Sequence, residues 1–119
     1  MNYLPNDAEQ IEVEGATVPF FKYVENGVTI IQFDSSQSGH PEPMINAMMG
    51  LQFIKDEQKL IMINSKPPLG LFPKIEDEFN FDLDALEDGN AKVVFTKKID
   101  AETKTNFADT GCGGTGCSN

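Results

Sequence analysis

The residues of this chain that are best suited to chemistry are two cysteines near its C-terminal end, Cys112 and Cys117. Four residues separate them, and three of these four are glycine. A flexible thiol pair of this kind could carry a persulfide, exchange disulfides or capture a soft metal ion. Two cysteines do not fill a tetrahedral zinc site, and closing so short a loop would add little stability. The alternative interpretation is a glycine-rich tail in which the two cysteines are incidental.

Two further side chains are candidates for a site in the folded part of the chain. The single histidine, His40, opens the segment His40-Pro41-Glu42-Pro43 and could act as a ligand, an acid-base group or an anion contact. Lys66 follows a predicted parallel strand, at the sheet edge where α/β folds often bind ligands. The alternatives are an exposed loop histidine and a solvated lysine.

The charge balance restricts the classes of partner. The chain has 119 residues with nine lysines, no arginine and 19 acidic residues, which gives a net charge of −10. Such a chain would be repelled by a phosphate backbone, so we expect no nucleic-acid partner. No apolar run approaches the roughly 20 residues of a membrane span, and no basic-then-apolar signal begins the sequence. We therefore expect no membrane partner and a cytoplasmic location.

Known catalytic patterns give no support for an enzyme. The sequence contains no Gly-rich phosphate loop, no His-Glu-x-x-His pattern and no recognisable Ser-His-Asp arrangement. We therefore assign no catalytic residue, no metal site and no cofactor, and the balance favours a non-enzyme.

Composition divides the chain into three parts. Residues 1–16 are acidic and lysine-free, and residues 99–119 are poor in bulky apolar side chains. Neither segment has enough apolar surface to offset the entropy of ordering, so both are predicted to be flexible. The predicted domain is residues 17–98.

Changes of hydrophobic period predict the elements of that domain. Residues 18–24 and 28–33 flank Asn26-Gly27, which is typical of a β-hairpin, and Pro19 favours an edge position for the first arm. A helix, a strand over residues 59–64 and a second helix ending near Phe79 should follow. Two more strands complete the order β-β-α-β-α-β-β: one in which Phe79, Phe81 and Leu83 alternate with polar residues, and one over residues 91–97. This order predicts an α/β (α+β) two-layer sandwich with a mixed sheet of four to five strands and two helices on one face.

The first predicted helix carries two apolar stripes. The main stripe, with i, i+3, i+4, i+7 spacing, should face the core and comprises Met44, Ala47, Met48, Leu51 and Ile54. The second stripe is Ile45, Met49 and Phe53, which could form a face for a protein partner. The alternative for this second stripe is ordinary packing against the sheet.

Residues 33–98, with the motif His40-Pro41-Glu42-Pro43 before the first helix, resemble the TusA/SirA-like fold. The resemblance is to an uncharacterised TusA-related bacterial branch. In TusA-type sulfur carriers a Cys-Pro-x-Pro motif holds a persulfide at this helix start, where the helix dipole favours a thiolate. This chain has His40 in place of the cysteine, and imidazole cannot carry a persulfide.

Two functions from different classes remain open. One is a non-catalytic TusA-like interaction module that lacks the carrier thiol and docks an unknown protein through its first helix. The alternative is a sulfur, redox or soft-metal carrier that uses the Cys112/Cys117 pair.

Overall fold

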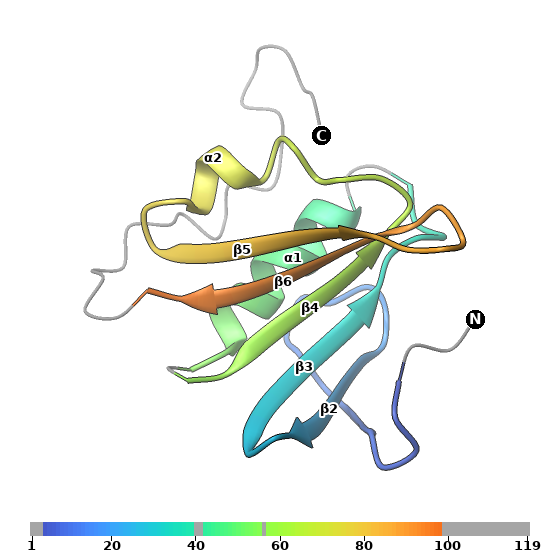
Figure 1. The fold of residues 1–119 in the computed structure, drawn as a ribbon, viewed down its shortest axis with the longest axis vertical. Coiled ribbons are helices and arrows are strands. Elements are labelled where there is room, and N and C mark those ends of the chain that lie inside the picture. Colours follow the sequence, from blue (N-terminus) through green and yellow to red (C-terminus); the bar gives the residue numbers. More distant parts are fainter. Residues whose placement is uncertain (1–3, 40–41, 56, 99–119) are drawn as a thin grey trace.

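The computed structural model of the chain describes residues 4–39, 42–55 and 57–98 and consists of one mixed sheet with two helices (Figure 1). The sheet has six strands in the spatial order β1-β2-β3-β4-β6-β5. The elements, in chain order, are β1 (Glu9–Ile11), β2 (Phe20–Glu25), β3 (Val28–Asp34), α1 (Glu42–Phe53), β4 (Lys59–Asn64), α2 (Phe72–Ile75), β5 (Phe79–Ala85) and β6 (Ala91–Lys97).

The β2–β3 hairpin confirms the prediction made from Asn26-Gly27. The two strands pair antiparallel, with Glu25 opposite Val28, so Asn26 and Gly27 form a two-residue turn. Their φ angles are 53° and 79°, the left-handed backbone that such a turn requires and that asparagine and glycine tolerate best. This local signal fixes the register of both strands.

The rest of the sheet contains both parallel and antiparallel pairs, as the element order requires. β3 and β4 are parallel and are joined through α1, whereas β6 pairs antiparallel with both β4 and β5. In Figure 1 the helix α1 lies behind the sheet. The result is the predicted α+β class, with a mixed sheet covered by helices on one face.

The main core lies between the helices and the sheet. It contains the complete main stripe of α1 together with Leu71 and Ile75 from the region of α2. Sheet residues on the same side include Phe20, Phe33 and Phe95, and the rings of Phe20 and Phe33 stack with centroids 4.7 Å apart. Both helices therefore contribute to one core on one face of the sheet, as predicted.

The opposite face of the sheet carries a smaller apolar cluster. Its buried members are Tyr23, Ile30, Ile61 and Ile63, and Leu4, Ala8 and Leu86 pack against them. The segment before β1 and the β5–β6 turn region thus shield part of a sheet face that no helix covers.

The sheet has one strand more than predicted, because residues 9–11 form β1. β1 pairs antiparallel with β2, and Val13 after it is 9% exposed. The prediction that residues 1–16 lie outside the folded domain is therefore wrong for this part, and β2 is an interior strand instead of the expected edge. β1 is short and its side chains are mostly exposed, so composition gave no apolar pattern to detect.

The second helix is much shorter than predicted. α2 ends at Ile75 instead of near Phe79, and Pro73 stands in its first turn. Phe79 begins β5, where it lies opposite Lys97 of β6 and is buried. Residues 76–78 form a turn instead of continuing the helix, and the strand predicted from the alternation of Phe79, Phe81 and Leu83 begins at Phe79.

Candidate functional site

The start of α1 is the place where the TusA-type motif would act, and its described part is tied to a neighbouring loop. His40 and Pro41 lie outside the described residues, so their predicted roles stay predictions. The Glu42 amide donates to the Gly39 carbonyl at 3.0 Å, and the Thr17 hydroxyl donates to Glu42 Oε1 at 2.8 Å. Pro43 is buried. The carboxylate at the positive end of the helix therefore already has a partner from the loop before β2.

Asn46 completes this attachment from one turn further along α1. Its side chain is fully buried; its Oδ1 accepts from the Thr17 amide at 2.8 Å. Its Nδ2 donates to Thr17 Oγ1 and to the Glu42 carbonyl, both at 2.9 Å. Sequence reasoning did not single out Thr17 or Asn46. The sequence feature that could have identified Asn46 is its position as a polar amide among the apolar residues of the helix.

A second polar cluster joins the carboxyl ends of β3 and β4. The buried Ser35 hydroxyl lies 3.0 Å from Asn64 Oδ1 and 3.1 Å from the Ile63 carbonyl, and Asn64 Nδ2 donates to the Lys66 carbonyl at 3.0 Å. The Lys66 backbone is thus fixed at this edge, while its side chain is exposed. Among the described residues, no ion pair connects the Lys66 side chain with another charged group.

The second stripe of α1 borders a groove. Met49 and Phe53 line it together with Gln52, Val13, Glu14 and Gly15, and its volume is about 400 Å³. Phe53 is 42% exposed. Ile45 is half-buried and does not line the groove, so the structure brings together two of the three predicted partner-face residues.

The floor of this groove depends on a close backbone approach at Gly15. Its φ angle is +84°, and a Cβ atom there would lie 2.7 Å from Met49 Sδ. The segment after β1 therefore packs directly on the second stripe and covers part of Met49, leaving Phe53 as the accessible apolar side chain. Sequence reasoning missed this contact because it placed residues 1–16 outside the domain.

Among residues 4–39, 42–55 and 57–98 no group of three or more His, Cys, Asp or Glu side chains is arranged to hold a metal ion. In those same ranges no helix has the length and apolar character needed to cross a membrane. Cys112 and Cys117 lie outside the described residues.

The comparisons with known proteins give no match. No protein-family model, no curated protein and no solved structure is significantly similar to the chain. The fold and the groove beside α1 therefore carry the functional argument.

Proposed function

We propose that this chain is a TusA-like, non-catalytic interaction module that docks a partner protein in the groove between α1 and residues 13–15. The observation that carries the proposal is the exposure of Phe53, a large aromatic side chain at the mouth of a formed groove. Aromatic side chains at such positions commonly supply a large share of binding energy in protein interfaces.

The TusA-like assignment is supported by the order of the elements and by the position of the motif. β3, α1, β4, α2, β5 and β6 follow the expected β-α-β-α-β-β order, and α1 begins at Glu42, inside His40-Pro41-Glu42-Pro43. Since the carrier cysteine is replaced by His40, the helix start lacks the atom that would hold a persulfide. A retained fold without that thiol favours a binding role over sulfur transfer at this position.

The chemistry of the groove favours a basic partner segment that carries a bulky apolar side chain. Glu14 is the one charged residue among the six described residues that line it. The whole chain carries a net charge of −10. A chain of this net charge, with Glu14 in the groove, attracts lysine- and arginine-rich segments. The apolar side chains of the groove provide a contact that does not depend on charge.

The alternative is a sulfur, redox or soft-metal carrier that uses Cys112 and Cys117. It predicts a different dependence on these residues, because a carrier needs the thiols and an interaction module does not. The two proposals can therefore be separated with point variants of the full chain.

The test is affinity capture from a native lysate, followed by measurement of the affinity for each captured protein. It compares the wild-type chain with Phe53→Ala, Leu69→Ala and the double variant Cys112→Ser/Cys117→Ser. Leu69 is the matched control, because it is also a large exposed apolar residue (63% exposed) but lies outside the groove. We expect Phe53→Ala to weaken the specific partner at least about fivefold, as removal of a central aromatic contact does, with the other variants unchanged.

Two results would contradict the module. One is an affinity for every captured protein that Phe53→Ala leaves unchanged. The other is the loss, in the double cysteine variant alone, of a captured partner. The same conclusion would follow if mass spectrometry found a transferable sulfur atom or metal ion on the wild-type chain and not on the double cysteine variant. The second result would support the carrier.

A further inference from the structure

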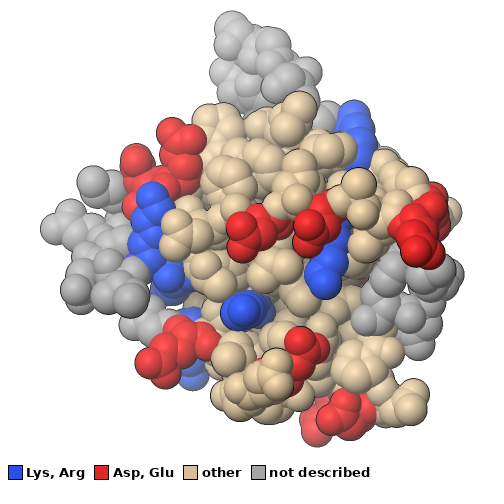
Figure 2. All heavy atoms as spheres, in the orientation of Figure 1, with Lys and Arg blue, Asp and Glu red and all other residues tan. Residues whose placement is uncertain are grey.

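A second hollow lies on the sheet face opposite the helices. It has a volume of about 410 Å³, within the range of small-molecule sites, and is formed by side chains of β2, β3, β4 and β6 with the segment before β1. Figure 2 shows this face, where acidic and lysine side chains are spread over a mostly uncharged surface. Its described lining residues are Leu4, Pro5, Tyr23, Glu25, Gln32, Ile61, Ile63, Leu86 and Lys92.

The polar centre of this pocket is Gln32, in the middle of the interior strand β3. Its side chain is 4% exposed, and its Oε1 accepts a hydrogen bond from the Tyr23 hydroxyl at 2.8 Å. No described residue accepts a hydrogen bond from the Gln32 Nε2 amide, yet the described residues contain no fully buried side-chain nitrogen that lacks a partner. The amide group therefore keeps contact with the pocket and offers it a hydrogen-bond donor.

In the pocket the Gln32 amide donor faces solvent, so a ligand that displaces this solvent must offer an acceptor in its place. The neighbours of Gln32 across the sheet on this face are apolar: Ile61 lies opposite it on β4, and Ile63 is further along that strand. An apolar residue at position 32 would continue this cluster but would leave the Tyr23 hydroxyl without its acceptor. The glutamine satisfies that hydroxyl and in addition offers the pocket a donor, which a ligand with a carbonyl acceptor would match.

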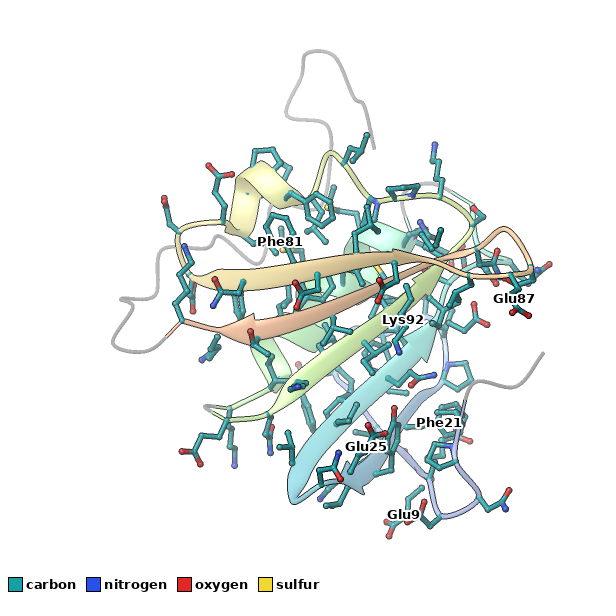
Figure 3. The ribbon with its side chains drawn as sticks, in the orientation of Figure 1. Glu9, Phe21, Glu25, Phe81, Glu87 and Lys92 are labelled. Atoms are coloured by element: carbon teal, nitrogen blue, oxygen red, sulfur yellow. The ribbon has the colours of Figure 1, made fainter. Side chains whose placement is uncertain are left out.

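Opposite charges lie at two parts of the pocket. Glu25 is at the end of β2 near the hairpin turn, and Lys92 is on β6 beside Ile63 (Figure 3). Neither forms an ion pair with another described residue, although Asp84 of β5 lies opposite Lys92 in the register. The pocket thus presents a negative end, a central amide donor and a positive end above an apolar floor.

We infer that this pocket binds a small zwitterionic, peptide-like molecule with apolar side chains. The ligand's ammonium group would lie toward Glu25, its carbonyl oxygen would accept from Gln32 Nε2, and its carboxylate would lie toward Lys92. Its apolar side chains would pack on Ile61 and Ile63. A fatty acid brings no positive group to Glu25, and a phosphorylated ligand brings negative charge toward Glu25. This inference is independent of the groove beside α1.

The test adds the dipeptide Leu-Leu to the full chain at low salt and measures binding by two-dimensional amide NMR spectra. N-acetyl-leucyl-leucinamide, which lacks both terminal charges, and decanoate, which has only the negative one, are the comparison probes. We expect saturable shifts of the Gln32 side-chain amide and of the Tyr23 and Ile61 backbone amides with Leu-Leu, and at least about tenfold weaker binding of both comparison probes.

Variants identify the groups responsible. Gln32→Met removes the donor but leaves the Tyr23 hydroxyl without its acceptor. The double variant Tyr23→Phe/Gln32→Met removes both groups, so no buried hydroxyl is left unpaired, and it serves as the test if the single variant does not fold. We expect the double variant to weaken Leu-Leu binding at least about tenfold. Lys92→Ala and Glu25→Gln should each weaken it several-fold, and Asp84→Asn should strengthen it by removing a competitor for Lys92. Gln52→Met and Lys55→Ala, on the helix side of the sheet, should change nothing.

Three outcomes would overturn the inference. The first is the absence of saturable shifts with Leu-Leu up to millimolar concentration. The second is equal or tighter binding of the capped dipeptide or of decanoate. The third is unchanged Leu-Leu affinity in a folded Tyr23→Phe/Gln32→Met variant.

Discussion

At the scale of single residues, the informative side chains are polar groups in buried positions. Asn46 is fully buried in α1 and fastens the Thr17 loop to the helix start through two hydrogen bonds, while a third joins it to the Glu42 carbonyl of the same helix. Gln32 and Tyr23 form a buried pair on the opposite face of the sheet. Asn46 has its hydrogen bonds within the chain, whereas Gln32 keeps a donor for the pocket. This difference separates a structural amide from a candidate binding group.

The Tyr23 hydroxyl leads to a prediction about stability at high pH. Burial, and secondarily the negative charge of Glu25, raise the pKa of Tyr23 above its usual value of 10.0. Because the folded state favours the protonated phenol, its contribution is complete below pH 10.0 and is lost as the pH rises from there through the folded-state pKa. We expect the free energy of unfolding to fall in this window, as measured by urea unfolding at a series of pH values.

The control for this prediction is Tyr23→Phe measured over the same pH range. Lysines also lose charge at high pH, but they do so in both proteins, so the difference between the two curves isolates the tyrosine. Parallel curves above pH 10.0 would contradict the prediction.

At the scale of elements, α1 lies very close to the sheet at Gly50. Gly50 faces β2 and β4, and a Cβ atom there would lie 2.8 Å from Leu60 Cδ1 and 3.0 Å from Phe20 Cε2. Leu60 is fully buried, so it has no space into which to move. The glycine lets α1 lie close enough to the sheet to bury its main stripe and still turn Phe53 toward the groove.

Gly50→Ala therefore tests this helix position. Alanine is the better helix former by about 1 kcal/mol, but overpacking a filled core costs typically about 1–3 kcal/mol. We expect a net loss of roughly 1 kcal/mol in the free energy of unfolding, because the overpacking exceeds the gain in helix propensity. Chemical denaturation of wild type and variant measures it.

Gly39→Ala serves as the comparison, because a Cβ atom at position 39 has no atom within 4 Å. If Gly50→Ala were as stable as wild type or more stable, the expected cost of overpacking at position 50 would be contradicted.

At the scale of the whole molecule, the N-terminal segment connects the two faces of the sheet. Leu4 and Ala8 pack against the cluster on the open face, β1 extends the sheet, and Val13 reaches the main core. The same segment forms one wall of the groove at Phe53 and one wall of the pocket at Gln32. Both candidate sites therefore depend on residues that composition alone assigned to a flexible region.

Removal of residues 1–16 tests this dependence. The truncated chain loses the β1–β2 pairing and the burial of Val13 and Ile11, so we expect a decrease of roughly 2–4 kcal/mol in the free energy of unfolding. Urea unfolding of the truncated and full chains measures the decrease. The matched control replaces the four acidic side chains of this segment by amides in the full chain, at Asp7, Glu9, Glu12 and Glu14. The control should keep most of the stability, because it removes charge but no contact. Equal stability of the truncated and full chains would contradict the assignment.

The sequence by itself determined the local structure and the fold class. Asn26-Gly27 specified the hairpin, because few other pairs accept two positive φ angles in succession. The stripe from Met44 to Ile54 specified which face of α1 is buried, because helical spacing brings those residues onto one face. The continuous apolar run of residues 60–63 specified an interior strand. Each of these signals lies within a few residues along the chain.

Only the tertiary structure decided the features that depend on contacts between distant residues. β1 has little apolar pattern of its own and exists because β2 offers it a partner. The groove at Phe53 needs Gly15, and the pocket at Gln32 needs Tyr23, Lys92 and Leu4. Except for Tyr23, which the hairpin turn places near Gln32, these residues are far apart in sequence, and their proximity follows from the strand order of the sheet, which no local pattern encodes.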